Sequence, residues 1–376
     1  MLHSGAARRV VLISADLRLG HNVLRSIWSL GAKTYLIYDK RSADFLRLSR
    51  LCEVLHASDN MAADDPNIFL RIINEFHADR PIDAVIASDV AGLVLLAKIR
   101  DRLLPPVFPM CDCDILTMLN SKRDFHALCI ATGVDVPKTL FFDNKNEIVL
   151  EKIREEVRFP FVLKPTESFG GRGVVIIDNL RDWDSQVLRN ASYNYSGLLA
   201  QEYVEGEDWS ISVLADNGAI KYWAAFSYSD LSTEFFERSD LLDMAERIIA
   251  ETRFTGVANF DARFDSTSGK MKFLECNPRF FARVGVTRLC GLNFVQAGLA
   301  MQETIFRPWI RAPRRTLTNG KYYSSRELRS LRGLQRLVTL RWPLAPLIRD
   351  LFELANDPLP PLMRSLHRDP ERKVLN

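Results

Sequence analysis

Three residues at alternate positions, Glu275, Asn277 and Arg279, carry side chains suited to holding a metal-bound phosphate. The apolar residues around them predict a buried strand, and side chains two positions apart in a strand project from the same face. Magnesium prefers carboxylate and amide oxygens and completes its shell with nucleotide phosphates. The pattern therefore predicts a site for a metal-bound triphosphate. The alternative is a strand whose polar face simply meets solvent.

Asp261 belongs to the same predicted site. It lies in a predicted strand over 257–264, and a turn at 266–269 leads the chain into the strand that carries Glu275. A hairpin of this kind places Asp261 across from Glu275. Two carboxylates and an amide from adjacent antiparallel strands would make a magnesium site, whereas a lone aspartate here would be a surface residue.

A glycine-rich segment follows Lys164. The apolar run 161–163 ends at this lysine, residues 166–173 contain three glycines, and a new strand is predicted over 174–177. Glycines let backbone amides close on phosphate oxygens, and lysine supplies a positive charge. The segment is not a Walker A loop, because no GK[ST] occurs in the chain. A plain glycine-rich hairpin is the alternative.

A strand predicted over 198–204 breaks at Glu205 and Gly206 before the next strand, 209–214. A chain that leaves a strand has unpaired backbone groups, and these can bind the edge of an adenine. Glu207 and Asp208 could then accept hydrogen bonds from ribose hydroxyls. An exposed acidic turn explains the same residues equally well.

The first part of the chain predicts a small parallel sheet. Strand 9–14, helix 21–30 and strand 33–38 form a βαβ unit, and strand 82–87 adds to it. No GxGxxG follows the first strand, which argues against a dinucleotide-binding oxidoreductase. Further helices are predicted over 92–104, 112–133, 147–157 and 241–253.

The composition excludes several protein classes. The 376 residues are 47% hydrophobic and 26% charged, which is typical of a globular protein with two or three packed units. No apolar run is long enough to span a membrane, and residues 1–15 lack a signal-peptide core, so we expect a cytoplasmic protein. The six cysteines include no CxxC pair, which argues against a zinc site.

The charge is unevenly distributed. Residues 307–376 contain 15 Lys+Arg and 6 Asp+Glu, a net charge of +9, although the whole chain carries +3. The arginines alternate with leucines, as over 328–340, and do not form a block. This pattern favours a packed helical terminus with a solvated basic face. We expect no nucleic-acid partner, and contact with a membrane surface is the less favoured alternative.

Taken together, the motifs resemble the ATP-grasp superfamily over roughly residues 5–305, as in the ATP-grasp modules of biotin carboxylase, carbamoyl-phosphate synthase and D-Ala-D-Ala ligase. No single motif is specific, but their order and spacing are. The resemblance implies an α/β protein: an N-terminal parallel open α/β domain (1–115), an α+β ATP-grasp domain with an antiparallel-sheet core (116–305) and a small lid (about 140–215), and a basic helical extension (306–376).

The resemblance also implies roles for individual residues. Lys122 and Lys164 would touch the α- and β-phosphates, and Arg279 would face the γ-phosphate as charge develops, with Lys164 and Arg279 as the catalytic pair. The remaining residues divide between the phosphate loop (Ser168, Gly170, Gly171, Arg172, Gly173), the adenine and ribose site (Gln201, Glu202, Tyr203, Val204, Glu207, Asp208) and the metal site (Asp261, Glu275, Asn277). Glu202 and Val204 would act through their backbone groups.

The implied activity is that of an ATP-dependent ligase with Mg²⁺ or Mn²⁺ as cofactor. It would activate a small-molecule carboxylate as an acylphosphate for attack by an amine, forming a C–N bond and releasing ADP and phosphate. The alternatives are a bicarbonate-activating enzyme of the carboxylase or carbamoyl-phosphate type, and an ATP-binding regulatory protein without turnover. The substrates and the oligomeric state are not predicted.

Two departures from the superfamily pattern stand out. Asn120 and Ser121 precede Lys122 where an acidic residue is common, which makes the role of Lys122 less secure than that of Lys164. After Arg279 the chain has Phe280, Phe281 and Arg283 where small residues are common. Arg283 could bind an anionic acceptor or pair with a surface carboxylate.

Overall fold

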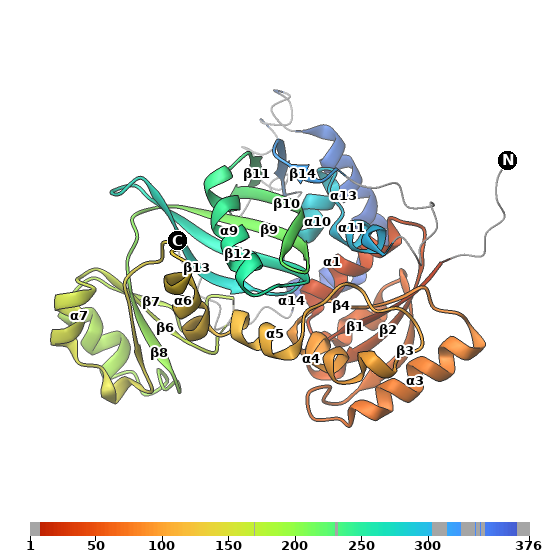
Figure 1. The fold of residues 1–376 in the computed structure, drawn as a ribbon, viewed down its shortest axis with the longest axis horizontal. Helices are drawn as coiled ribbons and strands as arrows, with labels where there is room; N and C mark the ends of the chain where they lie inside the picture. Colours follow the sequence, from red (N-terminus) through yellow and green to blue (C-terminus); the bar gives the residue numbers. More distant parts are fainter. Residues whose placement is uncertain are drawn as a thin grey trace. The chain divides into compact units, whose positions relative to one another are not determined.

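The computed structural model describes residues 8–168, 170–229, 232–302, 314–324, 335, 339 and 343–366 (Figure 1). They divide into two compact units, each made of separate stretches of chain. The first unit contains the described residues of 1–116, 210–259 and 277–367, and the second contains 117–209 and 260–276. The domain boundaries expected at 115 and 305 remain predictions.

The first unit contains the expected parallel sheet, in the order β3-β2-β1-β4. Its strands are β1 (Arg9–Ser14), β2 (Lys33–Asp39), β3 (Cys52–Ser58) and β4 (Ala84–Ala87). Val10 and Leu12 pack with α1 (Leu17–Trp28), while Val11 and Ile13 pack with α3 (Pro66–Asp79) and α4 (Val90–Ile99). Alternate residues of β1 thus bury both faces of the sheet, as continuous apolar runs in parallel strands predict.

A second sheet has the strand order β13-β12-β9-β10-β11-β15, with β14 paired to β10. The strands are β9 (Gly206–Asp216), β10 (Ala219–Tyr228), β11 (Ser232–Phe236), β12 (Gly256–Asp265), β13 (Lys270–Asn277), β14 (Thr316–Leu317) and β15 (Gly320–Tyr323). Strands β9, β12 and β13 each contain residues of both units. Helices α9 (Ser239–Glu251), α10 (Val284–Leu289) and α11 (Phe294–Met301) belong to the first unit.

The second unit contains an antiparallel sheet in the order β5-β8-β6-β7. Its strands are β5 (Thr139–Phe142), β6 (Phe161–Pro165), β7 (Val175–Ile177) and β8 (Leu198–Glu202), and α7 (Leu150–Glu156) and α8 (Leu180–Trp183) belong to the same unit. Phe161, Leu163 and Ala200 lie in its hydrophobic core. Because side chains alternate along a strand, Lys164 and Gln201 project from the opposite face. The expected α/β class, with parallel and antiparallel sheets, is confirmed.

The helical stretch predicted over 112–133 is two helices, α5 (Cys113–Asn120) and α6 (Lys122–Ala131). Ser121 separates them, and its hydroxyl accepts a hydrogen bond from the Asp124 amide at 3.2 Å. A serine in this position caps the new helix. Lys122 therefore begins α6, in its first turn.

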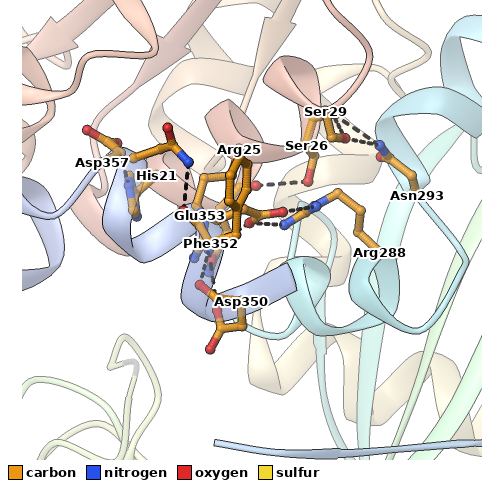
Figure 2. A network of polar contacts seen from close by, with 12 residues as sticks. His21, Arg25, Ser26, Ser29, Arg288, Asn293, Asp350, Phe352, Glu353 and Asp357 are labelled. Atoms are coloured by element: carbon orange, nitrogen blue, oxygen red, sulfur yellow. Dashed lines mark hydrogen bonds and ion pairs between the residues drawn. The ribbon is translucent and has the colours of Figure 1, made fainter. Parts of the chain in front are cut away.

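The described end of the chain is helical, as expected, with α13 (Leu344–Asn356) and α14 (Leu359–Leu366). Figure 2 shows how α13 is held: Glu353 pairs with Arg25 of α1 at 2.6 Å and with Arg288 of α10 at 2.5 Å. Asp350 pairs with the same Arg25 at 3.3 Å. The helical pattern predicted over 328–340 lies outside the described residues, apart from two single positions.

Candidate functional site

Lys164 is the centre of a charged cluster in the second unit. It lies on β6 opposite Leu199 of β8 and is 8% exposed. Burial lowers the pKa of Lys164, the carboxylates of Glu275 and Asp261 oppose this effect, and the ammonium of Lys122 adds to it. The pKa is lowered overall. The fold therefore brings one further predicted phosphate-binding lysine and two predicted metal ligands close to the buried ammonium of Lys164.

Lys122 joins α6 to the glycine-rich loop. Its Nζ donates to the carbonyl oxygens of Thr166 at 3.2 Å and Ser168 at 2.6 Å, and lies 3.7 Å from a carboxylate oxygen of Glu275. The side chain is 10% exposed. This position supports a role for Lys122 despite the unusual residues before it.

The loop after β6 needs its glycines. Gly170, Gly171 and Gly173 have φ of 69°, 79° and 70°, a region that residues with a Cβ rarely adopt. A Cβ on Gly173 would lie 2.7 Å from Pro165. Among the described residues, none beyond the chain neighbours would place a heavy atom within 4 Å of a Cβ on Gly170 or Gly171. Ser168 closes the loop by donating to the Arg172 carbonyl at 2.5 Å.

The predicted adenine segment leaves β8 after Glu202. The Gln201 side chain is 5% exposed and donates to Thr139 Oγ1 at 3.0 Å. The Glu202 carboxylate binds Lys272 at 3.1 Å and accepts the Lys138 amide at 3.2 Å. The Glu202 side chain is thus engaged and its backbone N–H donates to the Lys138 carbonyl at 2.8 Å, and a backbone role of Glu202 in binding a base remains a prediction.

A small cavity lies beside Gln201, between α6 and strands β5 and β8. It measures about 10 Å³ and its lining includes Lys122, His126 and Gln201. That volume suits a water molecule and excludes a purine. His126 Nε2 is buried without a hydrogen-bond partner there. A base would therefore lie outside this cavity, along the segment that follows Glu202.

Arg263, which the sequence patterns did not single out, organises the predicted ribose site. Its Nε donates to the Val204 carbonyl at 2.6 Å and its Nη1 to Asp208 at 2.7 Å. The guanidinium also lies over the Tyr203 ring, 5.6 Å from its centroid. Of the two acids considered for the ribose, Asp208 is thus the one held against residues 203–204. The sequence feature that could have identified Arg263 is its position two residues after Asp261 on β12.

The predicted metal ligands offer hard oxygen donors. Asp261 is on β12 and Glu275 on β13, neighbours in the sheet, and both carboxylates act on the Lys164 ammonium. Asn277, two residues after Glu275, accepts a hydrogen bond from Arg279 at 2.8 Å through Oδ1. The two carboxylates, both in the second unit, fit a divalent cation that takes its other ligands from phosphate and water.

Arg279 belongs to the first unit. Besides Asn277, it binds the Phe280 carbonyl through Nη1 at 3.0 Å. It also borders an apolar cavity of about 20 Å³ whose lining includes Phe108, Phe254 and Phe280. The guanidinium is therefore held in one orientation by the carboxamide of a predicted metal ligand.

Arg283 contacts residues at the end of β10 and the start of β11. Its Nε donates to Thr233 Oγ1 at 3.1 Å and its Nη2 to the Ser229 carbonyl at 3.0 Å. The guanidinium lies 4.0 Å from the centroid of the Tyr228 ring. Arg283 thus holds the ends of β10 and β11.

Comparisons with known proteins bear on the superfamily that the motifs resemble. Residues 194–318 match the family model described as "ATP-grasp in the biosynthetic pathway with Ter operon". D-aspartate ligase of Enterococcus faecium is 21% identical over 335 residues, which is 80% of this chain and 77% of that protein. The arginine-specific carbamoyl phosphate synthase large chain of Bacillus subtilis is 22% identical over 72% of this chain, which spans only 27% of that larger protein.

A solved structure shows the shared fold. The biotin carboxylase domain of 2-oxoglutarate carboxylase from Hydrogenobacter thermophilus, solved with MgADP, ADP and bicarbonate, superposes with a TM-score of 0.58 at 15% identity. The match covers 84% of this chain and 74% of that domain. The expected resemblance to the ATP-grasp superfamily is confirmed by the family model over residues 194–318 and by these relatives.

Proposed function

We propose that this protein is an ATP- and Mg²⁺-dependent ligase that joins a small-molecule carboxylate to an amine. The observation that carries the proposal is the convergence of Lys122, Asp261 and Glu275 on the buried ammonium of Lys164. Cations and carboxylates so arranged suit a metal-bound nucleotide, because phosphoryl transfer depends mainly on positioning and charge stabilisation. The D-aspartate ligase relative supports the class of reaction.

The reaction would have two steps. A carboxylate oxygen attacks the γ-phosphorus, the bond to the β,γ-bridging oxygen breaks, and ADP leaves. The amine nitrogen then attacks the acyl carbon, and phosphate leaves with the former carboxylate oxygen while the nitrogen loses a proton. Phosphorylation is needed because a carboxylate is a poor electrophile.

Each group of residues has a part in these steps. Lys122 and Lys164 would hold the α- and β-phosphates, and Arg279 would stabilise charge on the transferred phosphoryl group. Asp261, Glu275 and Asn277 would hold the divalent cation, which supplies charge neutralisation between the phosphates. The loop over 168–174 would close over the nucleotide and exclude water from the acylphosphate.

The decisive experiment traces ¹⁸O from the carboxylate substrate into the released phosphate. The protein is incubated with MgATP and a panel of ¹⁸O-labelled carboxylates, including D- and L-amino acids, together with candidate amines. We expect amine-dependent ADP release and one ¹⁸O atom in the released phosphate. Glu275→Gln should reduce turnover by about a hundredfold or more, because it removes a metal-ligand charge. Absence of label transfer with any productive pair would contradict the acylphosphate route.

Bicarbonate is the second candidate substrate, favoured by the match to carbamoyl phosphate synthase. ADP release that needs bicarbonate but no amine would select it. Tight ATP binding without ADP release for any acceptor would instead indicate a regulatory nucleotide-binding protein. A cytoplasmic location remains part of the proposal.

A further inference from the structure

Helix α13 turns an apolar face to solvent. Leu344, Ile348, Leu351 and Phe352 are 42%, 61%, 40% and 61% exposed. Their spacing places them along one side of the helix. Leu359 on α14 is also exposed, at 39%, and these five residues are called the outer face below. Of the thirteen large apolar side chains exposed in the described part of the chain, six lie between residues 344 and 362.

The opposite side of this segment is acidic and buried. Asp350, Glu353 and Asp357 are 6%, 6% and 1% exposed. Their partners are Arg25, Arg288 and Tyr322 for the first two, and His21 and Ser49 for the third (Figure 2). Rotating α13 to bury its leucines would separate these carboxylates from their buried partners. Buried charges without partners are strongly unfavourable in a protein interior. The ion pairs therefore hold the apolar side outward.

The outward side is apolar, and the one cation within residues 344–363 is Arg349. Asp350, Glu353 and Asp357 are the acids of residues 344–363, and all three point inward, whereas Arg349 is exposed beside Ile348. In residues 307–376 as a whole, 15 Lys+Arg stand against 6 Asp+Glu, so half of the acids are turned away from solvent in this one network. Burying acids leaves a surface complementary to an anionic, apolar partner.

We propose that the outer face docks on the surface of a lipid bilayer containing anionic lipids, with Ile348 and Phe352 entering the interfacial region. Helices that lie in a membrane surface combine an apolar side with flanking cations, and each cation adds attraction to anionic headgroups. In the part of the chain that the structure describes, no helix combines the length and apolarity needed to cross a membrane. The contact would be peripheral, and it is independent of the proposed ligase activity.

The test measures flotation of the full-length protein with large unilamellar vesicles of 70% phosphatidylcholine and 30% phosphatidylglycerol, and with pure phosphatidylcholine. We expect binding to the anionic vesicles and about tenfold less to the neutral ones, with loss of binding in high salt. The Ile348→Glu/Phe352→Glu variant should lower the bound fraction at least about tenfold. Arg349→Gln should lower it by a smaller factor.

The matched control is Ile130→Glu/Leu104→Glu, which introduces the same charge at side chains 62% and 66% exposed. It should bind vesicles as the unchanged protein does. Equal far-UV circular dichroism and MgADP affinity in both double variants exclude misfolding. The proposal is overturned if the unchanged protein does not float, or if the outer-face variant floats equally well. It is also overturned if light scattering shows a dimer that only the outer-face variant dissociates, which would assign the face to a second copy.

Discussion

At the residue scale, charged side chains of the candidate site lie near side chains of opposite charge. Lys164 is buried, yet carboxylates of Glu275 and Asp261 lie within electrostatic reach of it. A buried ammonium without such neighbours would lose its proton or destabilise the fold. The same balance recurs at Asp208, where Arg263 supplies the opposite charge. The sequence alone predicted the cluster around Lys164, whereas the pairing of Asp208 with Arg263 became apparent only from the structure.

Arg263 offers a test of the ribose assignment. Arg263→Met removes the partner of Asp208 and of the Val204 carbonyl, so the segment over 203–208 loses its anchor. We expect KM for ATP to rise about tenfold with kcat little changed, since a contact to the ribose is lost equally in the ground state and the transition state. The increase should be smaller for 2′-deoxy-ATP, because Asp208 would no longer be positioned for the 2′-hydroxyl.

The control for that measurement is Arg154→Met, which removes an exposed arginine of α7. Its kinetic constants should equal those of the unchanged enzyme. Equal losses with ATP and 2′-deoxy-ATP in Arg263→Met would mean that Arg263 acts on the segment generally and not through the ribose.

At the scale of elements, α13 is attached by buried charges. Glu353 lies between two arginines of different helices, Arg25 and Arg288, whose Nε atoms are buried without hydrogen-bond partners. Such a pairing need not stabilise more than an apolar contact would, but removing one member leaves buried cations behind. The orientation of the helix thus depends on the complete network.

Glu353→Ala should lower the free energy of unfolding by about 3–5 kcal/mol, because it removes the carboxylate that Arg288 pairs with and leaves the buried Arg25 with Asp350 alone. Urea unfolding at pH 7 measures this. Glu155→Ala, the same change at an exposed site on α7, should stay within about 0.5 kcal/mol of the unchanged protein. Similar values for the two variants would show that the network contributes little to holding α13.

The ionisation of Asp357 makes the attachment of α13 depend on pH. Burial raises the pKa of Asp357, but hydrogen bonds from His21, Ser49 and the Arg50 amide outweigh burial and hold the pKa below its usual range. An acid with a depressed folded-state pKa stabilises the fold above its unfolded pKa, about 3.9, and this contribution is lost as pH falls through the folded value. Asp357→Asn should therefore destabilise at pH 7, and its difference from the unchanged protein should shrink below about pH 4 in urea titrations.

At the scale of the whole molecule, nucleotide binding should couple to stability. A ligand that binds only the folded state adds about 2.7 kcal/mol at a concentration of a hundred times Kd. We expect MgADP to raise the unfolding temperature, and ADP with EDTA to raise it less. Lys164→Met should abolish the shift, whereas Lys270→Met, at an exposed site on β13, should keep it. An unchanged shift in Lys164→Met would remove this residue from the nucleotide site.

Parts of the fold were predictable and others were not. Strands β1, β2 and β4 appear in the sequence as continuous apolar runs because a parallel sheet buries both faces. Strands β3 and β5 lie at sheet edges and both escaped prediction, because Glu53 and His56 interrupt the apolar residues of β3 and because β5 is only four residues long. The glycine loop and the carboxylates on β12 and β13 were visible because each motif is local.

The sequence by itself determined the set of chemical groups: lysines at strand and helix ends, glycines between strands, and acids at alternate strand positions. Short-range spacing carries that information because strand and helix periods are regular. Only the tertiary structure decided which charges meet. Arg25 and Glu353 lie more than 300 positions apart, and no local pattern distinguishes an acid that will be buried from one that will face water. The direction of the apolar side of α13 followed from that pairing.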